Sequence, residues 1–164
     1  MSLLKPNFFN KTIYDINYKN LRDKGIKCLL FDLDNTCVGY YEKHPNTKLK
    51  NLFKKLNNMN FTVIIFSNAT KRRLEPFSNL SVITHHRSLK PLSYNFKKIM
   101  KKYNFSKEET CIIGDQLFTD ILGGNRVGIT TYLVEPLTKE DFIITKIFRK
   151  LEQRHLTKLK ERKK

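Results

Sequence analysis

The chain has 164 residues, which matches one domain of ordinary size, and its 40% hydrophobic residues suffice for a core. No stretch approaches the roughly 18 apolar residues of a membrane span, and residues 1–6 lack the apolar core of a secretory signal, so we expect a cytoplasmic protein. The formal charge of +17 favours anionic partners, namely phosphorylated metabolites, acidic lipid surfaces or nucleic acid, without choosing among them.

Residues 1–25 are predicted to form an N-terminal arm and a short helix. Aromatic and polar residues mix up to Asn20, which indicates an arm that packs on the domain and carries no motif. A helix over residues 17–24 would stop at Gly25, because glycine commonly ends helices. We expect the arm to belong to a single domain that spans residues 1–164.

Short apolar runs alternate with helical patterns over residues 26–134, the predicted core. The predicted strands cover residues 26–31, 61–66, 82–84, 110–113 and 130–134. The predicted helices cover residues 47–58, 92–103 and a third segment that starts near Gln116 and ends at Gly123-Gly124. This alternation predicts an α/β, Rossmann-like three-layer sandwich around a central, mainly parallel sheet of five strands. Ligands in such sheets bind at the carboxyl ends of the strands.

Residues 139–164 are predicted to form one basic C-terminal helix. Apolar residues share one side at its start, and the segment holds ten basic and four acidic residues. Two interpretations stay open: a helix docked on the sheet with a solvated basic end, or a helix that attaches to an anionic membrane or to nucleic acid.

Two carboxylates emerge together where the first core strand ends. Asp32 and Asp34 directly follow the apolar run over residues 26–31. Side chains two residues apart on an extended chain point the same way and lie about 6.5 Å apart. Such a pair gains nothing for folding, because each carboxylate loses hydration and the like charges repel. The pair therefore predicts an active site that contains a cation.

Further polar signals follow strands or precede helices farther along the chain. They are, in chain order, Ser67-Asn68, Lys90-Pro91, Gly114-Asp115 and, five residues beyond Asp115, Asp120. Because the carboxyl ends of parallel strands meet at one edge of a sheet, we expect all of these side chains to converge on Asp32 and Asp34.

With these four motifs, residues 26–134 resemble the haloacid dehalogenase superfamily of aspartate-dependent phosphatases. A closer resemblance, from Leu4-Lys5-Pro6 to the run over residues 113–126, covers nearly the whole chain. It is similar to the bacterial YqeG group of subfamily IIIA, which is related to phosphatidylglycerophosphate phosphatases. The resemblance implies the fold of that superfamily, and the short intervals between the motifs leave no room for the cap domain of many relatives.

The resemblance and the needs of phosphoryl transfer assign roles to the acidic residues. Asp32 is the expected nucleophile, which attacks phosphorus and forms an aspartyl-phosphate. Asp34 is the expected acid and base: it protonates the leaving oxygen and later accepts a proton from water, which requires a raised pKa. Mg²⁺ is the expected cofactor, held by the Asp32 carboxylate, the Asp34 backbone carbonyl and Asp115.

The remaining residues are expected to bind phosphate or to support the site. Ser67 would donate its hydroxyl to a phosphoryl oxygen, and Asn68 would help through backbone or amide hydrogens. Lys90 would offset the charge of the transferring group. Asp120 would hold Lys90 or a metal-bound water, or brace its own helix, and we favour such a supporting role.

An uncapped pocket cannot enclose a small metabolite, so we expect a phosphate monoester on a large substrate. Three functions stay open. The first is a phosphatase of a lipid precursor such as phosphatidylglycerophosphate, in peripheral contact with an anionic membrane. The second is a phosphatase of nucleic acid or protein phosphate groups, and the third is an RNA-associated binding module without turnover. The subgroup resemblance and the basic tail favour the first, and the intact motif set disfavours the third.

Overall fold

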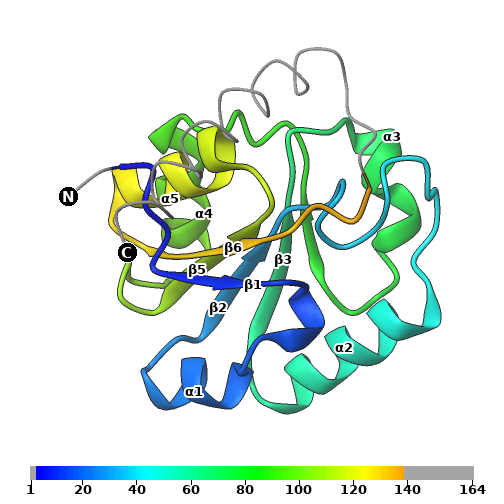
Figure 1. Ribbon diagram of the computed structural model, residues 1–164, viewed down its shortest axis with the longest axis horizontal. Helices are drawn as coiled ribbons and strands as arrows, with labels where there is room; N and C mark the ends of the chain where they lie inside the picture. The colour runs from blue at the N-terminus through cyan, green and yellow to red at the C-terminus, as the bar shows by residue number, and fades with distance from the viewer. Residues whose placement is uncertain (1–2, 139–164) are drawn as a thin grey trace, which may run out of the picture.

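The computed structural model describes residues 3–138, whose centre is one six-stranded, all-parallel sheet (Figure 1). The strands lie in the order β1-β6-β5-β2-β3-β4. Their bounds are β1 Phe8–Asn10, β2 Cys28–Phe31, β3 Thr62–Phe66, β4 Ile83–His85, β5 Thr110–Gly114 and β6 Thr130–Val134. Every residue of β2 and β5 is buried, as expected for parallel strands covered on both faces.

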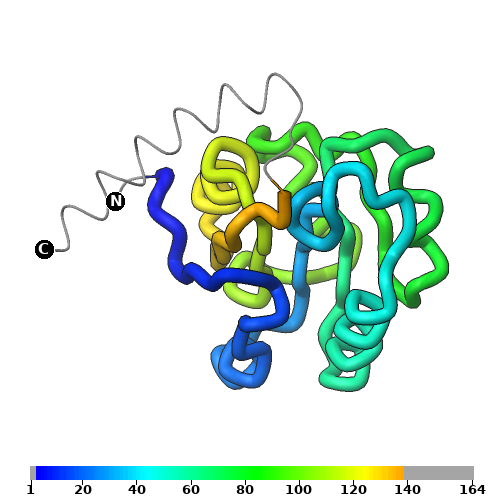
Figure 2. Tube along the Cα trace, turned by 45° about the vertical axis from the view of Figure 1, so that its right-hand side comes forward, coloured from blue at the N-terminus to red at the C-terminus, as the bar shows by residue number. Residues whose placement is uncertain are grey.

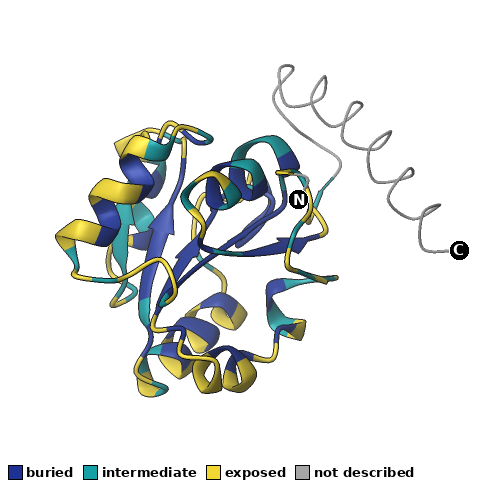
Figure 3. Ribbon diagram, turned by 90° about the vertical axis from the view of Figure 1, so that its left-hand side faces the viewer, coloured by how far each residue is buried: buried dark blue, intermediate teal, exposed yellow. Residues whose placement is uncertain are grey.

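Helices cover the sheet on both sides, which confirms the predicted three-layer sandwich. They are α1 Tyr18–Asp23, α2 Thr47–Asn58, α3 Lys71–Leu74, α4 Ser93–Lys102 and α5 Leu122–Val127, with short helical turns at Ile13–Asp15, Glu75–Phe77 and Leu117–Ile121. Apolar residues of α1 and α2 share one core cluster with Phe31 and Ile65, whereas those of α4 pack with Leu30 and Ile64 in another. Figure 3 shows the buried strands between these two layers.

The sheet has one strand more than predicted, because the N-terminal arm contributes β1. This strand pairs with β6, and the rings of Phe8 and Tyr132 stack with their centroids 5.3 Å apart. Figure 2 shows the arm running beside the segment that leads to residue 138. The strand is three residues long, contains Asn10 and exposes Phe9, so it lacks the apolar run by which the other strands are recognised.

The prediction that Gly123-Gly124 ends a helix is wrong. The helix α5 continues through both glycines and ends at Val127, followed by Gly128, whose φ of 77° is left-handed. The glycines instead allow close packing: a Cβ on Gly123 would lie 2.6 Å from the Phe96 ring, and one on Gly124 would lie 2.5 Å from Ile112 Cγ2. A glycine pair therefore marks a helix pressed against its neighbours, not a stop.

Residues 3–138 contain no cap domain. The interval between β2 and β3 holds only a turn-rich loop and α2, and the interval between β3 and α4 holds α3, one short helical turn and β4. No helix in this part of the chain has the length and apolar character that a membrane crossing needs. The predicted C-terminal helix over residues 139–164 lies outside the described residues.

Candidate active site

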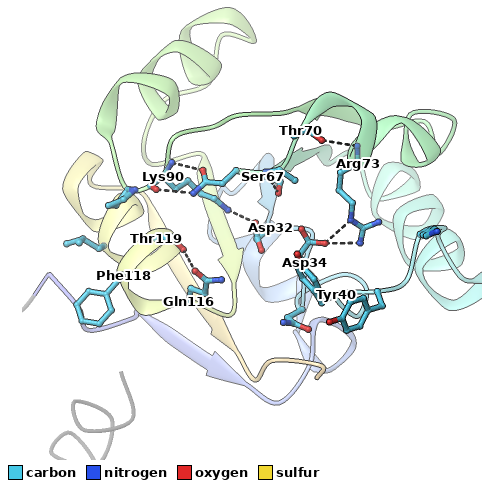
Figure 4. A pocket seen from close by; sticks show the side chains of 17 residues that line it. Asp32, Asp34, Tyr40, Ser67, Thr70, Arg73, Lys90, Gln116, Phe118 and Thr119 are labelled. Atoms are coloured by element: carbon cyan, nitrogen blue, oxygen red, sulfur yellow. Dashed lines mark hydrogen bonds and ion pairs between the residues drawn. The ribbon is translucent and has the colours of Figure 1, made fainter. Parts of the chain in front are cut away.

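A pocket of about 890 Å³ opens at the carboxyl ends of the strands, and five of the predicted site residues line it (Figure 4). Its walls come from loops after β2, β3, β4 and β5, because parallel strands deliver their carboxyl ends to one edge. The residues of the pocket that sequence analysis singled out are Asp32, Asp34, Ser67, Asn68 and Lys90.

Asp32 continues the pairing of β2, since its N–H donates to the Ile113 carbonyl of β5 at 2.9 Å. This bond fixes Asp32 beside Asp115, which follows the end of β5. The next turn is tight: Asn35 has a φ of 64°, a left-handed conformation that asparagine tolerates. Its backbone N–H donates to Val38, so the loop folds back and keeps Asp34 at the pocket.

Lys90 lies between two carboxylates in the wall of the pocket. Its Nζ is 2.6 Å from Asp32 Oδ1 and 2.7 Å from Asp120 Oδ1, and its side chain is 1% exposed. Burial alone would lower the pKa of Lys90, but Asp120 and Asp32 outweigh this and hold the pKa above its usual value. Lys90 is therefore a fixed positive charge in contact with Asp32.

Asp120 is completely buried, and each of its two carboxylate oxygens contacts a different group. One carboxylate oxygen contacts Lys90, and the other accepts a hydrogen bond from the Gln116 N–H at 3.1 Å. A Cβ on Gly114 would lie 2.2 Å from the Asp120 carboxylate, so the glycine at the end of β5 leaves room for this acid. Burial raises the pKa of Asp120, and the charge of Asp32 adds to this effect, although Lys90 opposes it.

Asp32, Asp115 and Asp120 form an acidic cluster in which one carboxylate oxygen from each lies within 4.8 Å of the others. The Thr36 hydroxyl donates to Asp115 Oδ1 at 2.7 Å and orients that side chain. Three carboxylates and one ammonium group carry a formal charge of −2, which a divalent cation neutralises. Oxygen ligands of this kind are those that Mg²⁺ prefers, so the residues fit the expected metal.

Asp34 is paired with Arg73, a residue that sequence analysis did not single out. The Arg73 Nε and Nη2 groups donate to Asp34 Oδ1 at 3.0 and 2.8 Å (Figure 4). Burial raises the pKa of Asp34, the charge of Asp32 raises it further, and Arg73 partly offsets both. Arg73 comes from α3, where Lys71, Arg72 and Arg73 are consecutive, and no spacing distinguishes it from its neighbours.

Ser67 and Asn68 follow β3 and have different surroundings. The Ser67 side-chain oxygen accepts from the Ala69 N–H at 3.2 Å, and the buried residue lines the pocket. The Asn68 amide holds the backbone of Lys90: its oxygen accepts from the Lys90 N–H at 2.8 Å, and its nitrogen donates to the Lys90 carbonyl at 3.1 Å. Asn68 thus positions Lys90 through its side chain.

Comparison with known proteins places the chain in a family. It is 35% identical to the Bacillus subtilis (strain 168) protein named "Probable phosphatase YqeG", over 96% of this chain and 92% of that protein. The chain belongs to the YqeG group of haloacid dehalogenase (HAD) superfamily phosphatases. As expected for this group, residues 89–136 match the family model described as HAD-hydrolase-like.

Two further proteins are similar to this chain. The chain is 29% identical to an Arabidopsis thaliana protein named "Phosphatidylglycerophosphate phosphatase 1, chloroplastic/mitochondrial", over 90% of this chain and 45% of that protein. Among solved structures, the cobalt-bound deoxy-D-mannose-octulosonate 8-phosphate phosphatase YrbI of Haemophilus influenzae aligns with a TM-score of 0.55. It shares 18% identity and aligns over 66% of this chain and 69% of its own. This similarity shows the common fold.

Proposed function

We propose that the protein is a Mg²⁺-dependent phosphatase that hydrolyses a lipid-linked phosphate monoester such as phosphatidylglycerophosphate through an aspartyl-phosphate. The observation that carries the proposal is the Asp32 carboxylate at an open pocket, paired with Lys90 and clustered with Asp115 and Asp120. An ion pair that only stabilised the surface of the fold would require neither a buried Lys90 nor a surplus of negative charge around that lysine.

In the first step an Asp32 oxygen attacks phosphorus, and the bond from phosphorus to the substrate oxygen breaks. Asp34 gives a proton to that leaving oxygen, which its raised pKa favours. In the second step a water molecule attacks phosphorus, Asp34 accepts the water proton, and the Asp32 carboxylate is restored as inorganic phosphate leaves. The two steps together consume one water molecule.

Positive charge and hydrogen-bond donors hold the phosphoryl group during both steps. Lys90, the Ser67 hydroxyl and the backbone N–H of Asn68 are the proposed donors. Asp32, Asp115 and the Asp34 carbonyl would hold Mg²⁺, which supplies charge neutralisation at the phosphoryl oxygens when bound. Asp120 fixes the position of Lys90 between itself and the nucleophile.

Two features support a large, lipid-linked substrate. Residues 3–138 contain no cap domain over the pocket, and aromatic side chains, those of Tyr40, Tyr41 and Phe118, line it beside the charged groups. The name of the Arabidopsis relative specifies phosphatidylglycerophosphate as substrate, which supports the same class here. We further propose that residues 1–164 form one catalytic domain, which includes residues 139–164.

The test is release of phosphate by the purified protein with Mg²⁺ from three substrates: an aryl phosphate, phosphatidylglycerophosphate and a 3′-phosphorylated oligonucleotide. We expect turnover of the first two, and Asp32→Asn to lower it by at least about 10³-fold, because the variant lacks the nucleophile. Asp23→Asn, an exposed aspartate on α1, is the matched control and keeps its activity.

Each other outcome has a definite meaning. Unchanged turnover by Asp32→Asn would disprove the nucleophile assignment. Turnover of the oligonucleotide but not of the lipid would favour nucleic acid as the substrate class. RNA binding with a steep salt dependence and no turnover of any ester would instead indicate a binding module.

A further inference from the structure

A tight turn beside the pocket holds two leucines in solvent. Residues 89–92 form this turn, closed by a hydrogen bond from the Leu92 N–H to the Leu89 carbonyl at 2.9 Å. We call it the leucine turn. Leu89 and Leu92 are each 56% exposed, whereas the residues between them, Lys90 and Pro91, line the pocket. The leucines therefore flank a part of the pocket wall.

Neither leucine suits its local backbone. Leu89 has a φ of 53°, the left-handed region that disfavours residues with a branched or bulky side chain and suits asparagine or glycine. Leu92 is the N-cap of α4 and makes no side-chain hydrogen bond there, although serine, threonine and asparagine are strongly preferred at such positions. Folding alone therefore does not explain these two side chains.

The backbone of the leucine turn positions Lys90, and the leucine side chains take no part in this role. Asn68 holds the Lys90 N–H and carbonyl, and these bonds fix the conformation that brings the ammonium group to Asp32. Asparagine at residue 89 would satisfy that conformation better than leucine does. Residues that violate local backbone or capping preferences at an exposed position beside a pocket are often retained because they serve a function.

Other apolar and basic groups line the pocket or lie in the segments that carry its lining residues. Tyr41, 72% exposed, lines it together with Lys43, and Phe118 also contributes to its wall. The stretches over residues 68–74 and 87–98 contain seven lysines and arginines and no acidic residue. Five of the seven are exposed, namely Lys71, Arg72, Arg87, Lys97 and Lys98. Arg126 adds a further guanidinium group, which donates to the Pro91 carbonyl at 3.4 Å. Leucine and aromatic side chains interspersed with basic groups are typical of surfaces that bind anionic bilayers.

We propose that the leucine turn docks the mouth of the pocket onto an anionic lipid bilayer, with Leu89 and Leu92 inserted at the headgroup level. The inference rests on the proposed lipid-linked substrate and names the surface that reaches it. A phosphate on a lipid headgroup cannot travel far from the bilayer, so the wall that carries Lys90 must approach the membrane. Apolar anchors on that wall bring Asp32 to the substrate, and the basic groups attract the acidic surface.

The test compares the double variant Leu89→Asn/Leu92→Ser with the full-length wild-type protein. Both substitutions suit their backbone positions, so the variant should fold at least as stably. Vesicles of phosphatidylglycerol and phosphatidylcholine serve as the probe in a sedimentation assay. We expect the partition coefficient of the variant to fall by about tenfold, because two apolar anchors are lost. The matched control is Phe9→Thr, which removes a 54% exposed apolar side chain from β1 and should bind vesicles like the wild type.

Activity separates failure of this inference from failure of the proposed function. Turnover of a water-soluble aryl phosphate should stay within about twofold of the wild type, since neither leucine contacts the reacting groups, whereas turnover of lipid in vesicles should fall about tenfold. Equal vesicle binding by the wild type and the double variant overturns the docking surface, even if the protein is a phosphatase. Absence of turnover on every ester overturns the function, whatever the vesicles show.

Discussion

Single residues of the active site act through shared contacts. Lys90 neutralises part of the charge of Asp32 and Asp120 at once, and Asn68 holds the backbone that carries it. A substitution of any one of these residues therefore disturbs the others, and the effects of double substitutions should not add.

Arg73 should be a positioning residue for Asp34. Arg73→Gln removes the two N–H donors that fix the carboxylate, and we expect kcat on an aryl phosphate to fall by about tenfold to a hundredfold, with a smaller change in KM. Arg73→Lys should restore only part of the loss, because a lysine offers no planar pair of donors. Steady-state kinetics measure both effects.

Arg22→Gln on α1 is the matched control, since this exposed arginine pairs only loosely with Asp23 at 3.9 Å. Equal kcat values for Arg73→Gln and the wild type would show that Asp34 needs no support from α3.

The sequence predicts which charged groups meet at the carboxyl edge of the sheet, but not the partners that orient them. Asp32, Asp34, Lys90, Asp115 and Asp120 are predictable, because each follows a strand that delivers it to one edge of a parallel sheet. Arg73 and Thr36 are not, because their contacts depend on how a loop and a short helix pack across the pocket. A run of three basic residues does not indicate which side chain points into the pocket.

At the scale of elements, the two glycines of α5 determine how closely the helix approaches the sheet. Gly124→Ala places a methyl group 2.5 Å from Ile112 Cγ2 and 2.6 Å from Thr131 Cγ2, so neighbouring side chains must shift. We expect the free energy of unfolding to fall by about 1–3 kcal/mol, the usual range for overpacking. Urea denaturation measures this loss.

The comparison for this substitution is Gly25→Asn. A Cβ there meets no heavy atom within 4 Å, and asparagine accepts the left-handed backbone of this residue, so the cost should be smaller. Equal stability of Gly124→Ala and the wild type would show that α5 moves away from the sheet without cost.

The strand β4 carries a histidine, His85, that should make stability depend on pH. Burial lowers the pKa of His85 below its usual 6.5, and nearby His86 and Lys98 add to this; its ring also stacks on Phe66 at 5.2 Å. The unfolded chain therefore binds more protons than the folded one just below pH 6.5, so this group makes stability rise with pH up to about 6.5 and fall on acidification.

His85→Phe keeps a ring on Phe66 and removes the titration. The slope of unfolding free energy against pH, between about pH 5 and 7, should therefore be smaller than in the wild type. Urea denaturation at a series of pH values gives both slopes, and identical slopes would contradict the role of His85.

Most elements of the fold were predictable, and the exceptions have physical causes. The five predicted strands stand out as short apolar runs, and the two long helices stand out because apolar residues repeat at helical spacing. The strand β1 is missing from the prediction because its three residues, Phe8 to Asn10, mix aromatic and polar side chains and do not form an apolar run. The end of α5 was misplaced because a glycine needed for close packing resembles one that stops a helix.

For the whole molecule, the acidic cluster should link metal binding to stability. Three carboxylates within 4.8 Å repel one another, and a cation that binds only the folded protein removes the repulsion. At about 100 times its dissociation constant, Mg²⁺ should raise the free energy of unfolding by about 2.7 kcal/mol. Thermal unfolding with Mg²⁺ and with a chelator measures the shift.

The control for this experiment is NaCl at the same ionic strength, because a chain of charge +17 also gains stability from screening. Asp115→Asn should keep the response to NaCl and lose most of the response to Mg²⁺. A full response to Mg²⁺ in that variant would place the metal elsewhere.

The pairing of β1 with β6 has a consequence for synthesis of the chain. Asn7 bonds to Thr131, 124 residues later, so the first strand leaves the ribosome long before its partner exists. At a synthesis rate of about 5–20 residues per second, Phe8 and Phe9 stay unpaired in the nascent chain for roughly ten seconds. During that interval the edge of β6 has not been made, and two aromatic residues near the N-terminus are accessible to chaperones.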